Sequence, residues 1–134
     1  EVAQRLQRTE FNRRSLAALY LDQGFLAGIG NYMRSEILFA ARLAPALKAN
    51  QLQRGERGEL ARQTLKISRR AYATAGITNA PAKVSLMRRS GLKRRDFRFA
   101  VFDRDGKPCL YCGDEIKKIV ASRRLYYCPS CQQK

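Results

Sequence analysis

The four cysteines of the chain fall in two C-x2-C pairs near its C-terminus, separated by fifteen residues. This spacing is typical of zinc sites. Two thiolates three positions apart in a tight turn can face one ion, and two such turns complete a tetrahedral sulfur site. Because four sulfur ligands leave no open position for water or substrate, we predict one structural zinc ion, Zn2+, held by Cys109, Cys112, Cys128 and Cys131.

The segment between the cysteine pairs has the composition of two short strands. Residues 116–120 and 124–127 are rich in Ile, Val, Leu and Tyr, and a turn is expected near residues 121–122. Gly113 suits the first cysteine turn, since glycine adopts a positive φ without steric cost. The pattern indicates a zinc-pinned β-hairpin. The alternative is two structural disulfides, for which four cysteines allow three pairings.

The charge balance points to a nucleic-acid partner. The chain has 27 Lys and Arg against 11 Asp and Glu, a net charge of +16 over 134 residues. Such a basic surplus is the electrostatic signature of nucleic-acid binding. No apolar run is long enough to span a bilayer, so no membrane partner is expected. Free-thiol metal ligands and the absence of a signal peptide favour a cytoplasmic protein.

Apolar residues near the start of the chain recur at helical intervals. They predict a first helix that ends near Thr9. A second helix carries Leu16 and Leu19 on one face and begins at Asn12 or Ser15 as its N-cap.

Three glycines within residues 24–30 allow two successive turns before a further helix, expected from about Gly30 to Arg42. The N-terminus of that helix would lie on a glycine-lined ledge, where unpaired N–H groups favour a phosphate. The side-chain amide of Asn31 can donate a further hydrogen bond there. The alternative is that Gly30 and Asn31 only cap the helix.

A long helix is expected from 56 to 75, with Leu60 and Ile67 on its inner face and Gly76 at its end. Residues 79–96 combine Pro, Gly and Ser with many cations. We expect a basic loop there, mobile when free and ordered by a bound polymer. Apolar residues alternate with others from 97 to 101, which predicts a strand.

The predicted fold class is therefore mainly α with a small β part: helix, two turns, helix in a bundle, followed by a zinc-bound hairpin finger. We expect a helical domain at 1–78, the basic mobile loop at 79–96 and the four-cysteine finger at 97–134. The chain begins at Glu1 rather than Met, so we also expect it to be a piece of a longer protein.

Two motifs in this order resemble a known family. Residues 21–32 with Glu36 resemble the helix-two-turn-helix motif of the formamidopyrimidine-DNA glycosylase and endonuclease VIII family. Residues 101–113 and 123–132 resemble the start and the end of that family's zinc finger. The resemblance implies the DNA-binding C-terminal half of a base-excision repair enzyme, which removes oxidised bases and nicks the abasic site.

The resemblance also implies site residues. Asn31 matches the family asparagine that binds a backbone phosphate near the lesion, with Gly30 and Gln23 in the same DNA-binding motif. Arg123 matches the zinc-finger arginine that holds the phosphates flanking the flipped nucleotide. Arg124 is the adjacent rival for that role, and the other interpretation is an exposed turn arginine.

The family's catalytic groups are an N-terminal proline, the glutamate after it and a lysine, and the chain has no Pro-Glu start. We therefore expect this chain alone to bind DNA and catalyse nothing. The resemblance implies double-stranded DNA with oxidised bases, pyrimidines in the endonuclease VIII branch, or abasic sites as partner. It also implies a missing N-terminal catalytic domain and a monomer at the bacterial nucleoid. The alternatives are a non-enzymatic zinc-ribbon module that binds nucleic acid and a purely structural interaction domain.

Overall fold

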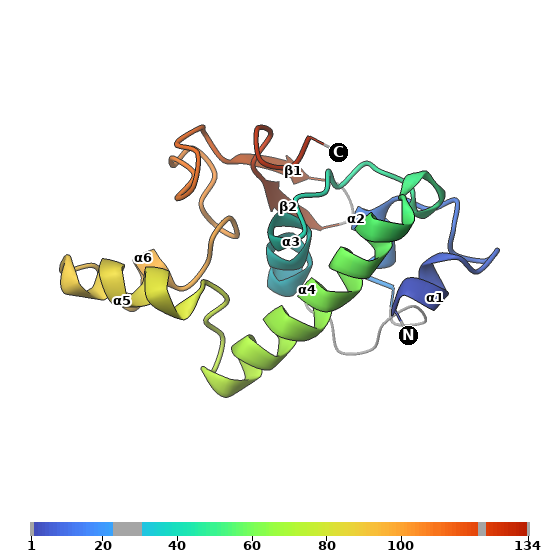
Figure 1. Cartoon of the computed structure of the whole chain (residues 1–134). Coiled ribbons are helices and arrows are strands. Elements are labelled where there is room, and N and C mark those ends of the chain that lie inside the picture. Colours follow the sequence, from blue (N-terminus) through green and yellow to red (C-terminus); the bar gives the residue numbers. More distant parts are fainter. Residues whose placement is uncertain (1, 23–30, 121–122, 134) are drawn as a thin grey trace.

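The computed structural model describes residues 2–22, 31–120 and 123–133. It is mainly helical with a two-stranded antiparallel hairpin, which confirms the predicted fold class (Figure 1). The described elements are α1 (Val2–Leu6), α2 (Leu16–Leu19), α3 (Asn31–Ala40), the 3-10 helix η1 (Ala49–Gln51), α4 (Arg54–Ala73), α5 (Pro81–Arg89), α6 (Arg94–Phe97), β1 (Lys117–Val120) and β2 (Arg124–Tyr127).

Helix α3 joins the helical part to the finger. It packs against α4 on one side and against β2 on the other (Figure 1). Ile37 and Leu38 of α3 are fully buried in one apolar cluster with Leu60 and Ile67 of α4 and Leu125 of β2. Burial of each such side chain contributes about 1.5–3 kcal/mol, so α3 is the element on which both parts depend.

Helix α2 begins as predicted. Ser15 is its N-cap, and its Oγ accepts a hydrogen bond from the backbone N–H of Ala18 at 3.2 Å. The hydroxyls of Tyr20 and Thr64 lie 2.7 Å apart and tie this region to α4. Helix α1 ends at Leu6 rather than near Thr9, since the N–H groups of residues 7 and 8 bond to carbonyls three positions back and the exposed residues 7–10 continue as turns.

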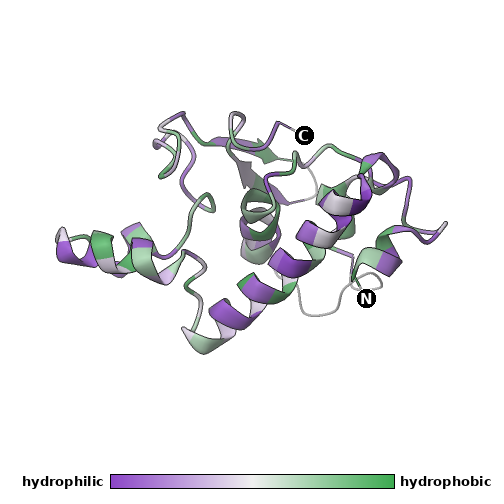
Figure 2. Ribbon diagram, viewed as in Figure 1, coloured by the Kyte–Doolittle hydropathy of each residue, from purple (hydrophilic) through white to green (hydrophobic). Residues whose placement is uncertain are grey.

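Helix α4 is the long helix of the prediction, shifted slightly towards the N-terminus. Figure 2 shows hydrophilic residues on its outer side and hydrophobic ones towards the rest of the molecule. Gly76 follows its end with φ +108°, and a Cβ there would lie 2.8 Å from Nη2 of Arg98. The helix itself ends at Ala73. Ala75, with φ +58°, is the first residue in the left-handed region, so Gly76 completes the turn two residues after the C-cap, where its N–H donates to the carbonyl of Ala71.

The structure corrects the prediction of an irregular loop at 79–96, since this stretch contains α5 and α6. Pro81 occupies the first turn of α5, where a missing N–H costs nothing. Val84 and Met87 lie one helical turn apart and pack with Ile77 and Phe97 in a small separate cluster. This apolar cluster supports the helices despite their dense positive charge.

The strand predicted at 97–101 is also wrong. Phe97 ends α6, and residues 98–102 run without regular structure. The backbone N–H groups of residues 100–102 bind a side chain of α3 instead of a neighbouring strand. The division into domains at 78 and 96 stays a prediction. Among the described helices, none is both long and apolar enough to cross a membrane.

The hairpin agrees with the prediction where it is described. β1 pairs with β2 in antiparallel register, with Lys117 opposite Tyr127 and Val120 opposite Arg124. The predicted turn residues 121–122 and the glycine-rich ledge at 24–30 lie outside the described residues.

Candidate nucleic-acid interface and metal site

The four cysteine sulfurs converge on one point. They all lie within 4.8 Å of one another. The sulfurs of Cys109 and Cys131 are 3.9 Å apart, and those of Cys112 and Cys128 are 3.4 Å apart. A tetrahedral zinc ion with Zn–S bonds of about 2.3 Å requires sulfurs about 3.8 Å apart. The geometry therefore fits zinc, whereas a disulfide requires sulfurs only about 2.05 Å apart.

The surroundings of the sulfurs act in opposite directions. Burial raises the pKa of the Cys128 and Cys131 thiols, whereas at Cys109 burial is outweighed by the hydrogen bonds from backbone N–H groups, which lower the pKa. Two backbone N–H groups, of Tyr111 and Cys131, point at sulfurs from 3.4 Å. Such donors support thiolates, and a bound ion makes deprotonation favourable. Gly113 has φ +84°, as predicted for the turn after the first cysteine pair.

Gln132 anchors the second cysteine turn to the helical part. Its Oε1 accepts a hydrogen bond from the backbone N–H of Cys128 at 2.8 Å, and its Nε2 donates to the carbonyl of Leu43 at 3.0 Å. Because this side chain is buried, both bonds are shielded from water. The metal site is thereby fixed relative to the end of α3.

The predicted DNA-binding residues Asn31 and Arg123 lie on the same side of the molecule. Asn31 is the first residue of α3, and Arg123 directly precedes β2. One side chain, Arg34, connects them: its Nη2 donates to Oδ1 of Asn31 at 3.1 Å and to the carbonyl of Arg123 at 3.3 Å. Gly30 and Gln23, the other two predicted residues, lie outside the described residues.

Positive charge is concentrated beside this pair. A hollow of about 440 Å³ between α2 and the hairpin is lined by Arg14, Arg34 and Arg123, with Asp22 paired to Arg14. Burial, together with the charge of Arg123, lowers the pKa of Arg34 to about 10. Arg34 still carries its charge at neutral pH, so an anion placed here would relieve the repulsion between the two guanidinium groups.

Three consecutive polar residues of α3, Arg34, Ser35 and Glu36, are buried. Of these, Glu36 was expected only as part of the helix-two-turn-helix motif, and no role was predicted for Arg34 or Ser35. All three side chains hold the finger part. Arg34 binds the carbonyls of residues 123 and 124, and Oγ of Ser35 accepts from the N–H of Tyr126 at 3.0 Å. The only available signal was that three consecutive polar residues must place at least one on the inner face of α3.

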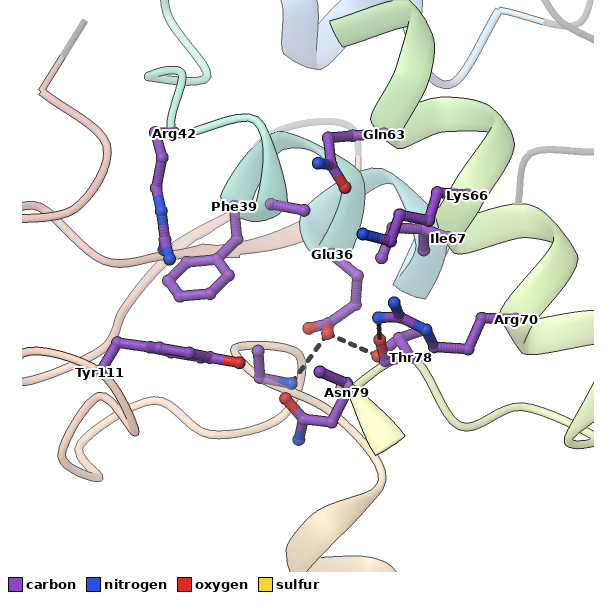
Figure 3. Close-up of a pocket in the computed structure, with 13 residues that line it drawn as sticks. Glu36, Phe39, Arg42, Gln63, Lys66, Ile67, Arg70, Thr78, Asn79 and Tyr111 are labelled. Atoms are coloured by element: carbon purple, nitrogen blue, oxygen red, sulfur yellow. Dashed lines mark hydrogen bonds between the residues drawn. The ribbon is translucent and has the colours of Figure 1, made fainter. Parts of the chain in front are cut away.

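Glu36 is buried beside residues 78–79, and its carboxylate accepts hydrogen bonds from both sides (Figure 3). Its Oε1 accepts from the Thr78 hydroxyl at 2.5 Å and the N–H of Ala100 at 2.8 Å. Its Oε2 accepts from the N–H groups of Val101 and Phe102 at 2.8 and 2.9 Å. These four donors saturate the carboxylate, so Glu36 acts as an anchor for residues 100–102 and has no free lone pair for acid–base chemistry.

A second hollow, of about 230 Å³, lies beside Glu36 (Figure 3). Lys66 and Arg70 of α4 and Arg42 beyond the end of α3 line it. Arg70 donates to the carbonyl of Thr78 at 2.9 Å. This hollow faces the C-terminal half of α3 and is therefore separate from the Asn31 end of the helix.

Comparison with known families matches both parts of the chain. Residues 1–81 match the family described as Formamidopyrimidine-DNA glycosylase H2TH domain. Residues 106–134 match a zinc finger found in FPG and IleRS. This match and the sulfur geometry together establish one structural zinc ion at the four cysteines.

Similar proteins match along nearly the whole chain. Endonuclease 8 of Shigella sonnei is 42% identical over 132 residues, which are 98% of this chain and 47% of that protein. Endonuclease 8 of Escherichia coli O9:H4 is 43% identical over 132 residues, with the same coverage. The chain thus spans about half the length of these curated relatives.

Solved structures show the same likeness. The MutM (Fpg) protein of Thermus thermophilus is 34% identical with a TM-score of 0.73, over 91% of this chain and 46% of that chain. Lactococcus lactis Fpg in complex with DNA containing an abasic site is 28% identical with a TM-score of 0.75, over 99% and 46%.

Proposed function

Because the chain belongs to the formamidopyrimidine-DNA glycosylase H2TH family, we propose that it is the DNA-binding half of a base-excision repair glycosylase and AP lyase. That enzyme would remove oxidised bases and nick the abasic site. The observation that carries the proposal is the pairing of Asn31 and Arg123 through one buried guanidinium, beside a zinc-anchored hairpin. The Lactococcus relative bound to abasic-site DNA supports it.

The geometry suggests how this half would hold DNA. An enzyme that extrudes a base must hold the bent backbone on both sides of the gap. The amide of Asn31 would donate to one phosphate from the start of α3, where the helix dipole also favours an anion. The exposed guanidinium of Arg123 would bind the phosphates beside the flipped nucleotide through paired hydrogen bonds.

The chemistry itself would come from a separate N-terminal catalytic domain carrying the proline amine and its glutamate. The Endonuclease 8 relatives favour the branch that acts on oxidised pyrimidines. We infer that the whole protein works as a monomer in the cytoplasm, at the bacterial nucleoid. In this arrangement the present chain supplies DNA affinity and no cleavage.

The test is a binding titration of the zinc-loaded chain with an abasic-analogue duplex, followed by fluorescence anisotropy. Affinity should fall with salt at a log–log slope on the order of −4 if about five phosphates are neutralised. Asn31→Ala and Arg123→Ala should each weaken binding. The matched control is Arg42→Ala, an exposed cation at the opposite end of α3, which is about 15 Å long.

Two results would contradict the proposal. The first is equal affinity of the Asn31 and Arg123 variants and the unaltered chain for the duplex. The second is strand cleavage by this chain alone at an abasic site. The zinc-finger family that matches residues 106–134 is also found in IleRS, so an RNA duplex is added as a competitor of the DNA duplex. Loss of RNA binding in both variants, with DNA affinity unchanged, would favour the non-enzymatic zinc-ribbon module.

A further inference from the structure

Arg34 is a buried cation whose guanidinium reaches three separate elements. It is 3% exposed. Its Nη1 donates to the carbonyl of Ala17 in α2 at 2.9 Å. Its Nη2 is shared between Oδ1 of Asn31 at 3.1 Å and the carbonyls of Arg123 and Arg124, both at 3.3 Å. The planar guanidinium of arginine can donate to several acceptors that lie in different directions, whereas the ammonium group of lysine is a compact charge at the end of a flexible chain.

The bond to Asn31 determines which end of the amide faces outward. An asparagine amide has an acceptor oxygen and a donor NH2, and the hydrogen-bond network decides how they are placed. Here the oxygen is taken by Arg34, so the NH2 group is the end available to a ligand. A phosphate accepts hydrogen bonds and does not donate them at neutral pH, so this orientation is the productive one.

The hydrogen bonds from Arg34 to the carbonyls of residues 123 and 124 prepare the second phosphate contact, that of the Arg123 side chain. They hold the backbone from which the exposed Arg123 side chain extends. Arg123 therefore starts from a fixed point close to α3, and less conformational freedom is lost when its guanidinium binds a phosphate. The same side chain thus prepares both predicted contacts.

We propose that Arg34 is a positioning residue that couples Asn31 and Arg123, so that the two phosphate contacts are made as a unit. The proposal rests on the proposed DNA-binding function and goes beyond it, because it assigns the coupling to one residue that never touches DNA. A residue that only stabilised the fold would affect DNA affinity equally whether Asn31 was present or not.

The experiment is a double-mutant cycle in DNA affinity. The zinc-loaded chain, Arg34→Lys, Asn31→Ala and the double variant are titrated with the abasic-analogue duplex, well below the unfolding temperature of the weakest variant. Arg34→Lys should weaken binding about tenfold, the effect of losing one hydrogen bond to a charged group. In the Asn31→Ala background the same change should weaken binding less than about threefold, since much of its effect passes through Asn31.

A second variant tests the orientation without removing the buried guanidinium. Asn31→Asp keeps an acceptor for Arg34 and makes the bond charge-assisted, so the melting temperature should equal or exceed that of the unaltered chain. The outward NH2 becomes a carboxylate oxygen that repels phosphate. Affinity should therefore fall at least as far as in Asn31→Ala.

The outcomes separate the two claims. If Asn31→Ala and Arg123→Ala weaken binding but Arg34→Lys does not, the coupling is overturned and the proposed function stands. An equal loss from Arg34→Lys in both backgrounds, or a lower melting temperature for Asn31→Asp, also overturns the coupling. If the unaltered chain does not bind the duplex, the proposed function fails and this inference fails with it.

Discussion

Replacing Glu36 by Gln tests how the finger is attached to α3. The carboxylate receives four hydrogen bonds, two on each oxygen. Glutamine keeps one acceptor oxygen and places an NH2 group where the other oxygen was. On the Oε1 side the NH2 can donate to the Thr78 hydroxyl, which then donates to the carbonyl of Arg98 at 3.2 Å. In this orientation the buried N–H of Ala100 loses its partner, and the charge of the carboxylate is lost from all the bonds.

The size of the effect follows from these losses. A hydrogen bond to a charged group contributes about 1.5–3 kcal/mol, and an unsatisfied buried donor adds a further penalty. We therefore expect Glu36→Gln to lower the free energy of unfolding by about 3 kcal/mol. This is a large fraction of the roughly 5–15 kcal/mol that stabilises a typical domain.

Urea denaturation of the zinc-loaded chain, followed by circular dichroism, measures this difference. The control is Glu115→Gln, which also removes one negative charge from the finger part but at an exposed position paired with Lys117. It should change stability by less than about 0.5 kcal/mol. If Glu36→Gln is as stable as this control, the anchoring role of Glu36 is refuted.

Three further predictions concern zinc, a glycine and the charge of α5 and α6. Removing zinc with a chelator should unfold the hairpin and abolish DNA affinity. Zinc content and fluorescence anisotropy follow the two effects. Unchanged affinity would show that the finger is not needed for DNA binding. Gly76→Ala should lower the free energy of unfolding, measured by urea denaturation, by about 1 kcal/mol more than Gly91→Ala. Both glycines have positive φ, but only at Gly76 would a Cβ lie against the side chain of Arg98. Equal losses of stability would argue against the close approach of Arg98. Replacing the exposed Arg89 of α5 and Arg95 of α6 by Gln should reduce the slope of log affinity against log salt by about one for each phosphate that the variant no longer binds. An unchanged slope would place α5 and α6 outside the DNA interface.

The parts of the fold that local patterns determine were predicted correctly. The cysteine spacing specifies a tetrahedral site within 23 residues, and the strand composition between the pairs specifies the hairpin. Ser15 marks the start of α2 by a hydrogen bond to a residue three positions away, and Gly76 completes the turn after α4 by a hydrogen bond to Ala71. Each of these signals is complete within a few turns of chain.

The features that were missed depend on distant partners. Glu36 binds backbone groups more than sixty positions away, and Ser35 binds one 91 positions away, so the local pattern of three polar residues could place one of them on the inner face but could not show what it binds. In α5 the two inward residues, Val84 and Met87, are outnumbered by cations and find their apolar partners at Ile77 and Phe97. Charge therefore suggested a loop where a small tertiary cluster stabilises a helix.

The most direct test of the central claim is an NMR titration that observes both predicted phosphate-binding side chains at once. The side-chain signals of Asn31 Nδ2 and Arg123 Nε are recorded in the zinc-loaded chain while an abasic-analogue duplex is added. The chemical shifts of both signals should change along one saturation curve. The side-chain amide signal of Gln63, which lines the hollow beside Glu36, should not change. A duplex that saturates the protein while either the Asn31 or the Arg123 signal remains unmoved would contradict the account.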